Sequence, residues 1–391
     1  MLARDDRHAI DWVERAHALV PMIEAAGDRN EAERRIAPEV IKALHEAGLF
    51  RMLLPASLGC GAADFFAFNQ VIETVAAADA STAWCLAQQV ATTHTAGFLD
   101  PKVARDVFGP PDGAVAWGPG NIGKAVVADG GYVLTGRWRF ASGSEHCPWL
   151  GGHSTVYDRD GKVRRDRDGN PVLRTMLFRK EAATFYDVWH VIGLRGTRSN
   201  EYEVRDLFVP QAYSVWREAV SERREHGPLY NLPLLTLYGI GFAGVALGIA
   251  RAMLSEFIAL ACRKAPRNMG RLADSAVVQA DVARAEARLG SARAYLTETL
   301  TAIYAQASDV APIGLTDRAR VRLACTNAIQ AAVEVADFAY KGAGVDAIFP
   351  GSPFERRFRD MHTLSQQIQA RSVHFEQVGQ ILLGVPPEEF L

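Results

Sequence analysis

Residues 125–134 read Ala-Val-Val-Ala-Asp-Gly-Gly-Tyr-Val-Leu, two short apolar runs separated by Asp129-Gly130. An Asp-Gly pair between such runs is a strong signal for a β-hairpin. The hairpin lies inside a longer segment, from about Ala114 to Val215, in which the apolar pattern has a period of two. This segment is expected to form a β domain.

Helical patterns flank the β segment on both sides. Before it, apolar residues recur at three- and four-residue spacing, as in Ile36, Val40 and Leu44. After it, residues 276–306 run almost without a helix breaker, and helices of this length pack as bundles. The order predicts an α+β chain rather than a doubly wound parallel sheet. The expected parts are an N-terminal helical domain (1–111), a middle β domain (112–220) and a C-terminal helical bundle (221–391).

Composition restricts the classes of partner. With 43 Lys and Arg against 45 Asp and Glu, the formal charge is −2, so no global basic field favours nucleic acid. The five cysteines lie far apart without a C-x-x-C pair, which argues against zinc or a disulfide framework. The longest apolar stretch, residues 239–250, is shorter than the ~20 residues of a membrane span. The first residues are charged where a secretory signal is apolar. We expect a cytoplasmic protein with no metal, membrane or nucleic-acid partner.

One motif has to be set aside. Gly118-Pro119-Gly120-Asn121-Ile122-Gly123 satisfies the G-x-G-x-x-G pattern of dinucleotide-binding proteins. That pattern needs a helix directly after it, because the helix N-terminus holds the pyrophosphate. Residues 124–128 instead read as a short strand. The motif is therefore interpreted as a glycine-rich loop between strands.

Four further motifs occur in order along the chain, and their sequences are LTGRWRFASG (134–143), GLRGTRSN (193–200), DLFVP (206–210) and FERRFRD (354–360). Together with the helical–β–helical order, they resemble the acyl-CoA dehydrogenase superfamily. The first two motifs look most like its two-component flavin-dependent monooxygenase branch. This resemblance implies a β-barrel-like middle domain, a C-terminal four-helix bundle, a homotetramer, and a flavin between the β domain and the bundle.

The resemblance also implies a chemistry. Oxygenase components of this branch take reduced FMN or FAD from a separate flavin reductase and form a flavin hydroperoxide with dioxygen. They then transfer oxygen to a small aromatic or heteroatom-containing substrate. FMN and FAD both remain open for this chain, because the arginine on the phosphate side is either Arg263 or Arg267.

The dehydrogenase branch needs a carboxylate that removes the α-proton of an acyl thioester. The family position after Arg359-Asp360 and the alternative position near Tyr238 both lack Asp and Glu. An acyl-CoA dehydrogenase-like FAD oxidoreductase with a displaced base is therefore the second interpretation. A catalytically inactive binding or scaffold subunit is the third.

Relatives in the monooxygenase branch carry a histidine on the final helix, where this chain has Gln367. Gln367 is assigned to catalysis and substrate contact, since it can hydrogen-bond a substrate hydroxyl, although it cannot accept a proton. On a continuous helix His362 would point roughly 140° away from Gln367, and His374 would lie nearly on its face two turns along.

The resemblance assigns the remaining site residues. Ser142 is expected near flavin N5, where its hydroxyl is placed to stabilise the hydroperoxide. Trp84 is expected to line the substrate cavity, and His146 is assigned either to catalysis or to a structural hydrogen bond at a strand end. The expected flavin contacts are Trp117, Ser142, Trp189, Arg198, Ser199 and, from a neighbouring subunit, Arg263.

Overall fold

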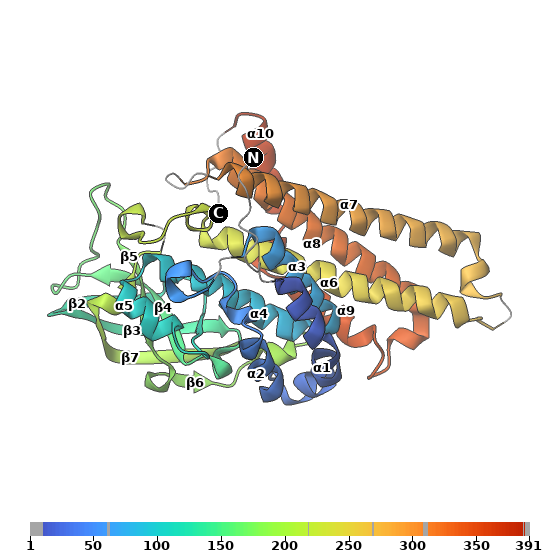
Figure 1. Cartoon of the computed structure of the whole chain (residues 1–391), viewed down its shortest axis with the longest axis horizontal. Helices are drawn as coiled ribbons and strands as arrows, with labels where there is room; N and C mark the ends of the chain where they lie inside the picture. The colour runs from blue at the N-terminus through green and yellow to red at the C-terminus, as the bar shows by residue number, and fades with distance from the viewer. Residues whose placement is uncertain are drawn as a thin grey trace.

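The computed structural model describes residues 11–60, 63–217, 219–267, 270–307, 312–385 and 387. The predicted α+β class and the order of helices, sheet and helices are confirmed. Figure 1 shows the sheet at one end of the molecule, the long helices α6, α7 and α8 at the other, and α1–α4 between them. The N-terminal helices are α1 (Trp12–Glu33), α2 (Pro38–Glu46), α3 (Phe65–Ala78), α4 (Ala80–Thr92) and α5 (Pro101–Phe108). The C-terminal helices are α6 (Leu234–Arg263), α7 (Ala276–Gln306), α8 (Leu315–Ala343), α9 (Glu355–Leu364) and α10 (Val373–Leu382).

The middle region, expected to be barrel-like, is one eight-stranded mixed sheet with the path β6-β7-β3-β2-β4-β5-β8. Its strands are β1 (Val115–Trp117), β2 (Gly123–Ala128), β3 (Gly131–Ala141), β4 (Trp149–Tyr157), β5 (Leu173–Arg179), β6 (Thr184–Tyr186), β7 (Asn200–Pro210) and β8 (Ser214–Val215). One edge of β4 pairs with β5, while β1 and β2 share the other edge, both in parallel. The Asp129-Gly130 turn joins β2 and β3 as the predicted antiparallel hairpin.

A buried tryptophan accounts for the last glycine of the G-x-G-x-x-G motif. Trp138 is fully buried, stacks on Tyr202, and donates its Nε1–H to the carbonyl of His153 at 3.0 Å. A Cβ on Gly123 would lie 2.5 Å from the Trp138 ring, and one on Gly136 2.6 Å from it. The second half of the motif therefore makes room for Trp138 and continues directly into β2, as the sequence predicted.

Helix α6 is the central helix of the molecule. It packs against α3, α4 and α8, and most of its residues are buried. By length and composition α6 could cross a membrane, with a mean hydropathy of 1.8 over its most apolar window. Here the neighbouring helices cover the apolar faces of α6, because a helix that is apolar on all sides has to be buried in the core of a globular protein.

The sequence placed Gln367 on the final helix, and this prediction is wrong. Helix α9 ends at Leu364, and Gln367 has an extended backbone with φ −78° and ψ 164°. Its side-chain oxygen accepts a hydrogen bond from the Gln369 N–H at 2.7 Å and so caps a short 3₁₀ turn at 368–370. Local bonds of this kind compete with helix continuation. The angles deduced for His362 and His374 on a continuous helix therefore do not apply.

Candidate functional site

Ser142 is positioned by an irregularity at the end of β3. The register between β3 and β7 shifts between Trp138 and Ala141, and Phe140 has a left-handed backbone with φ 63°. A bulge of this kind bends a strand and redirects the side chains that follow it. Ser142 consequently lies inside the molecule, with an exposed fraction of 5 %.

Ser142 belongs to a buried set of side chains that we call the hydroxyl network (Trp84, Ser142, Ser199 and Thr197). The Trp84 Nε1–H donates to Ser142 Oγ at 3.0 Å, and Ser142 Oγ lies 2.7 Å from Ser199 Oγ. Ser199 Oγ in turn lies 2.7 Å from Thr197 Oγ1, which donates to the Leu194 carbonyl at 2.8 Å. Because buried hydroxyls are costly without partners, these bonds hold Ser142 Oγ in place.

Four aromatic side chains extend from this network, and we call them the aromatic wall (Trp84, Phe242, Tyr238 and Trp117). Trp84 stacks on Phe242 with ring centroids 4.1 Å apart, and Phe242 packs against Tyr238 at 5.9 Å. The Trp117 Nε1–H donates to the Tyr238 hydroxyl at 2.8 Å. The rings come from α4, α6 and β1. The wall therefore joins all three regions of the chain through a stack of nearly parallel rings, and aromatic side chains of this kind line many cofactor sites.

The segment before β7 is held in place by the carboxyl group of Asp360. The Leu194 N–H donates to Asp360 Oδ1 at 2.6 Å, and the Trp189 Nε1–H donates to the Leu194 carbonyl at 3.0 Å. Leu194 and Arg198 both have positive φ, 52° and 43°, a strained conformation for residues with side chains. Burial raises the pKa of Asp360 to about 7, although the Leu194 N–H opposes the shift. Strain of this kind is often found at functional sites.

Trp189 and Arg198, both predicted flavin contacts, flank this segment. The Trp189 ring packs edge to face against Phe140, with centroids 6.1 Å apart. Phe140 lies two residues before Ser142 in the chain. The Arg198 guanidinium donates to Glu145 at 2.8 Å. Arg198 and Glu145 both line a cavity of about 250 Å³, together with Gly143 and His146.

His146 lies near Ser142 along the chain but outside the hydroxyl network. Its ring packs against Phe50, with centroids 5.9 Å apart. Burial lowers the pKa of His146 to about 3, with a smaller contribution from His45. Its Nε2 atom is buried and has no hydrogen-bond partner among the described residues. His146 is therefore neutral near pH 7, and the expected hydrogen bond at the strand end is not formed through Nε2.

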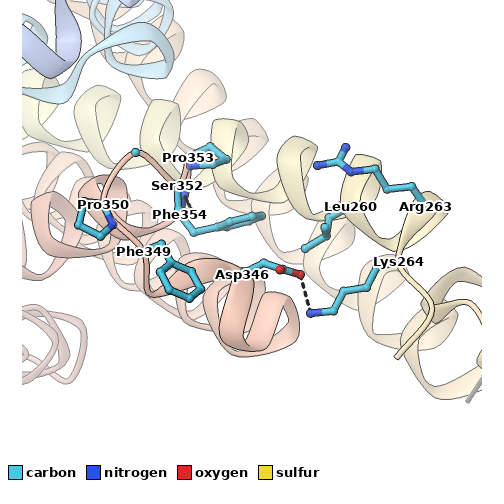
Figure 2. A pocket seen from close by; sticks show the side chains of 10 residues that line it. Leu260, Arg263, Lys264, Asp346, Phe349, Pro350, Ser352, Pro353 and Phe354 are labelled. Atoms are coloured by element: carbon cyan, nitrogen blue, oxygen red, sulfur yellow. Dashed lines mark hydrogen bonds and ion pairs between the residues drawn. The ribbon is translucent and has the colours of Figure 1, made fainter. Parts of the chain in front are cut away.

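Arg263 lies apart from the other predicted site residues. Figure 2 shows it at the C-terminal end of α6, beside a cavity of about 570 Å³ that is also lined by Lys264, Asp346 and Phe349. With a rise of about 1.5 Å per helical residue, Arg263 is roughly 30 Å along α6 from Phe242. Within one chain it cannot meet Ser142, so only the predicted role toward a neighbouring subunit remains open.

The structure thus brings together Trp84, Ser142, Ser199 and Trp117, with Trp189 and Arg198 at the edge of the same region. Sequence reasoning missed Phe242 and Thr197, and it noted Tyr238 only as a position without a carboxylate. It also missed Gln89, whose Nε2–H donates to the Ser142 carbonyl at 2.8 Å. Tyr238 and Phe242 lie four residues apart on an apolar helix. That spacing places both rings on one face of the helix and was the available signal for the aromatic wall. The same spacing is also typical of residues in a hydrophobic core.

Comparison with known proteins adds a second line of evidence. The family model described as "Acyl-CoA dehydrogenase, N-terminal domain" matches residues 15–98, and the model described as "Acyl-CoA dehydrogenase, C-terminal domain" matches residues 240–371. The sheet lies between these two matches.

Individual relatives align over nearly the whole chain. The indole-3-acetate monooxygenase of Pseudomonas putida is 29 % identical over 360 residues, which cover 91 % of this chain and 90 % of that protein. The flavin-dependent monooxygenase, oxygenase subunit HsaA, of Rhodococcus jostii (strain RHA1) is 28 % identical over 364 residues, covering 90 % of this chain and 92 % of that protein. The structure of XiaF from Streptomyces sp. in complex with FADH2 and glycerol superimposes with a TM-score of 0.88 at 24 % identity, covering 97 % of this chain and 96 % of that one.

Proposed function

The chain belongs to the acyl-CoA dehydrogenase family, and from this premise we propose that it is the oxygenase component of a two-component flavin-dependent monooxygenase acting on a small aromatic substrate. The relatives described above are named as monooxygenases, and one of them as an oxygenase subunit. The geometry of the site supports the same assignment over dehydrogenation.

The observation that carries the proposal is the replacement of a base by a buried hydroxyl. Tyr238 occupies one of the two positions where a dehydrogenase would need a carboxylate, and Gln367 lies near the other. Burial raises the pKa of Tyr238 to about 12, so the phenol stays protonated near pH 7. The amide side chain of Gln367 does not ionise near pH 7 and so cannot act as a base. In their place the site presents the Ser142 hydroxyl.

The residues of the site fit a flavin. A flavin ring is flat, with polar atoms at its edge, and the aromatic wall and the hydroxyl network offer aromatic side chains beside a fixed hydroxyl. The buried Oε1 of Gln89 and Nε2 of Gln367 have no hydrogen-bond partner among the described residues, as expected for polar groups that await a ligand. Bound reduced flavin supplies the activation of oxygen.

The chain contributes hydrogen bonding and exclusion of water. Trp84 donates to Ser142 Oγ, so the hydroxyl proton of Ser142 points elsewhere. Thr197 gives its only hydroxyl proton to the Leu194 carbonyl, so Ser199 donates to Thr197 and Ser142 donates to Ser199. A ligand that accepts a hydrogen bond from Ser142 therefore takes the place of Ser199 as the acceptor. The aromatic wall keeps this hydroxyl dry, and a hydrogen bond in a dry site is stronger than the same bond in water.

The assembly and location of the protein follow as parts of this proposal. We propose a cytoplasmic homotetramer that receives reduced FMN or FAD from a flavin reductase, with Arg263 near the flavin phosphate of a neighbouring subunit. Three large apolar side chains beside the Arg263 cavity support such an interface, since Val345, Ile348 and Phe349 are all more than half exposed. Light scattering that shows a monomer would contradict the tetramer.

The flavin behaviour of the purified protein tests the proposal. The absorption spectrum is recorded first, then reduced FMN or FAD is bound without oxygen and the complex is mixed with oxygen in a stopped-flow instrument. We expect a nearly colourless protein as purified, and a transient absorbing species that precedes oxidised flavin. A yellow protein that holds oxidised FAD, shows no transient and is bleached by an acyl thioester would instead establish the dehydrogenase interpretation.

A further inference from the structure

The hydroxyl network has a single direction. At one end the Trp84 indole can only donate a hydrogen bond, and at the other end the Leu194 carbonyl can only accept one. Each hydroxyl group between these ends has one proton, so every proton points toward Leu194. Ser142 therefore donates to Ser199 and accepts from Trp84. Because a hydroxyl oxygen can accept two hydrogen bonds, Ser142 is able to accept one more from a ligand.

The acceptor at the end of the network belongs to a strained residue. Leu194 has φ 52° and ψ 36°, a left-handed conformation that is unfavourable for a residue with a side chain. In this conformation the Leu194 carbonyl accepts the Thr197 hydroxyl at 2.8 Å and the Trp189 Nε1–H at 3.0 Å. Relaxation of Leu194 to an ordinary backbone conformation would turn its carbonyl away from these donors. The direction of the network therefore depends on what holds Leu194.

Asp360 holds Leu194 from helix α9. The Oδ1 atom of Asp360 accepts the Leu194 N–H at 2.6 Å, and the residue is buried. The two segments are in direct contact, since a Cβ on Gly193 would lie 2.1 Å from the Arg359 carbonyl oxygen. A hydrogen bond to a carboxylate is roughly twice as strong as one between neutral groups. The ionised Asp360 side chain therefore stabilises the strained conformation of Leu194.

The charge of Asp360 responds to the groups that face it. Burial is the main cause that raises the pKa of Asp360 to about 7, and the acidic side chains of Asp79 and Glu31 add to this shift. The Leu194 N–H and the guanidinium of Arg356 oppose the shift. The charged and the neutral form of Asp360 are therefore both populated near pH 7, and the hydrogen bond to Leu194 weakens as the pH falls.

Building on the proposed function, we propose that Asp360 is a positioning residue for Ser142 and sets its preference for the reduced form of the flavin. With Leu194 held by Asp360, the network draws the Ser142 proton toward Ser199, so Ser142 meets the ligand as an acceptor. Reduced flavin carries a proton on N5, near which Ser142 is expected, and can donate it to this acceptor. N5 of oxidised flavin can only accept, so it would have to break the bond from Ser142 to Ser199. Asp360 thus acts on the flavin through four hydrogen bonds and touches neither flavin nor substrate.

Two indole N–H groups report on the network in the protein without flavin. Trp189 donates to the Leu194 carbonyl, and Trp84 donates to Ser142 at the other end. Their resonances are followed by NMR with ¹⁵N-labelled tryptophan between pH 5.5 and 8.5, and Trp84→Phe and Trp189→Phe variants assign them. We expect both resonances to shift with a midpoint near pH 7 in the wild type, and neither to do so in Asp360→Asn, which keeps an acceptor but not the charge.

A break in the network separates its two ends. In Thr197→Val the Trp189 resonance should still shift with pH, because Leu194 and Asp360 are unchanged. The Trp84 resonance should no longer shift, because the valine has no hydroxyl to connect Leu194 with Ser199. The indole of Trp138 donates to the His153 carbonyl, outside the network, and serves as the control that should not respond.

Flavin binding tests the consequence for the site. Dissociation constants are measured for oxidised FMN and FAD and, without oxygen, for the reduced forms. The ratio of the oxidised to the reduced constant should fall about 2- to 10-fold in Asp360→Ala and Thr197→Val, the effect of one neutral hydrogen bond. It should stay at the wild-type value in Ser144→Ala, which removes a nearby buried hydroxyl outside the network. Because each value is a ratio within one variant, a general loss of packing does not imitate the effect.

Two results would overturn the inference. One is a Trp84 resonance that does not shift with pH, or whose shift persists in Asp360→Asn and so belongs to another group such as His190. The other is a ratio of dissociation constants that Thr197→Val leaves unchanged, a variant that still decides the matter if Asp360→Ala does not fold. The proposed function is judged separately by the oxygen-mixing experiment. An intact flavin transient with an unchanged ratio refutes only the role of Asp360, and a changed ratio without the transient refutes only the monooxygenase assignment.

Discussion

Removal of the Ser142 hydroxyl is the most direct perturbation of the site. Ser142→Ala deletes the acceptor of the Trp84 Nε1–H, which lies at 3.0 Å, and one partner of Ser199 at 2.7 Å. Ser199 keeps its bond to Thr197, whereas the Trp84 N–H stays buried beside Phe242. A buried donor left without an acceptor costs about 1–3 kcal/mol. We therefore expect a free energy of unfolding lower by about this amount.

The effect on the reaction follows from the same hydroxyl. If Ser142 donates to the oxygen-reacted flavin, its loss removes one charge-assisted or strongly polarised hydrogen bond in a dry site. Such a bond is worth about 1.5–3 kcal/mol, or roughly a 10- to 100-fold shorter lifetime of the transient. The lifetime is measured in the stopped-flow experiment without substrate. Protein loaded with equal amounts of reduced flavin is compared, so that weaker flavin binding does not contribute.

Two further variants separate the role of the hydroxyl from general damage. Ser144→Ala removes a buried hydroxyl two residues away in the same turn and is expected to leave the transient lifetime unchanged. Trp84→Phe removes the donor but leaves Ser142 paired with Ser199. The double variant Ser142→Ala, Trp84→Phe should therefore lose less stability than the sum of the single losses. An unchanged lifetime in Ser142→Ala, or an equal loss in Ser144→Ala, would refute the role assigned to Ser142.

Four other substitutions, one of them a control, test the surroundings of the site. Burial raises the pKa of Asp360 to about 7, so the folded protein favours the protonated carboxyl group. The protonated carboxyl group therefore contributes fully to the free energy of unfolding below pH 4. That contribution is lost as the pH rises to about 7. Relative to Asp360→Asn, the wild type should lose about 3 kcal/mol between pH 5 and 8 in urea unfolding, and equal pH dependence in both proteins would contradict the shift. Gly193→Ala places a Cβ against the Arg359 backbone and should lower the free energy of unfolding by about 1–3 kcal/mol or more. The control Gly290→Ala, which has open space around the new Cβ, should raise the free energy of unfolding by about 0.5–1 kcal/mol. Gln367→His should add an ionisation near pH 6.5 to the rate profile, and a wild-type profile that already has this limb would show that a histidine titrates in the reaction.

The order of the regions could be predicted because it rests on local patterns. The period of two between Ala114 and Val215 and the turn at Asp129-Gly130 are set by neighbouring residues, and both appear in the sheet. The start of α4 is local in the same way, since the Asp79 carboxylate caps the helix by accepting the Thr82 N–H at 2.9 Å. In each case the residues that determine the structure are adjacent in the chain.

The contacts of the site could not be predicted, because they join distant segments. The bond from Trp84 to Ser142 spans 58 residues and depends on how α4 packs against the sheet. The stack of Trp84 on Phe242 depends in addition on α6. The family resemblance singled out Ser142 and Trp84 separately, but no pattern in the sequence shows that one is the donor to the other.

The error at Gln367 has a different cause. The family pattern carried the final helix past residue 364, and the sequence Leu364-Ser365-Gln366-Gln367 contains no proline or glycine to stop it. The helix ends because local side-chain bonds replace it. Gln367 caps the next turn, and His374 Nε2 lies 2.7 Å from the carbonyl of Ile368. Whether the helix continues or local hydrogen bonds replace it depends on small differences in free energy, and helix propensities do not include these differences.

The neutrality of the site connects its electrostatics with its chemistry. Burial lowers the pKa of His94, His146 and His153 and raises that of Tyr238, so each of these groups is uncharged near pH 7. An enzyme that abstracts a carbon-bound proton needs an ionised base, and this set offers none. A site that positions a reactive cofactor needs fixed hydrogen bonds in a dry environment, and burial supplies these at the cost of the ionisable base. The same loss of solvent that makes dehydrogenation unfavourable here therefore makes the Ser142 hydroxyl effective.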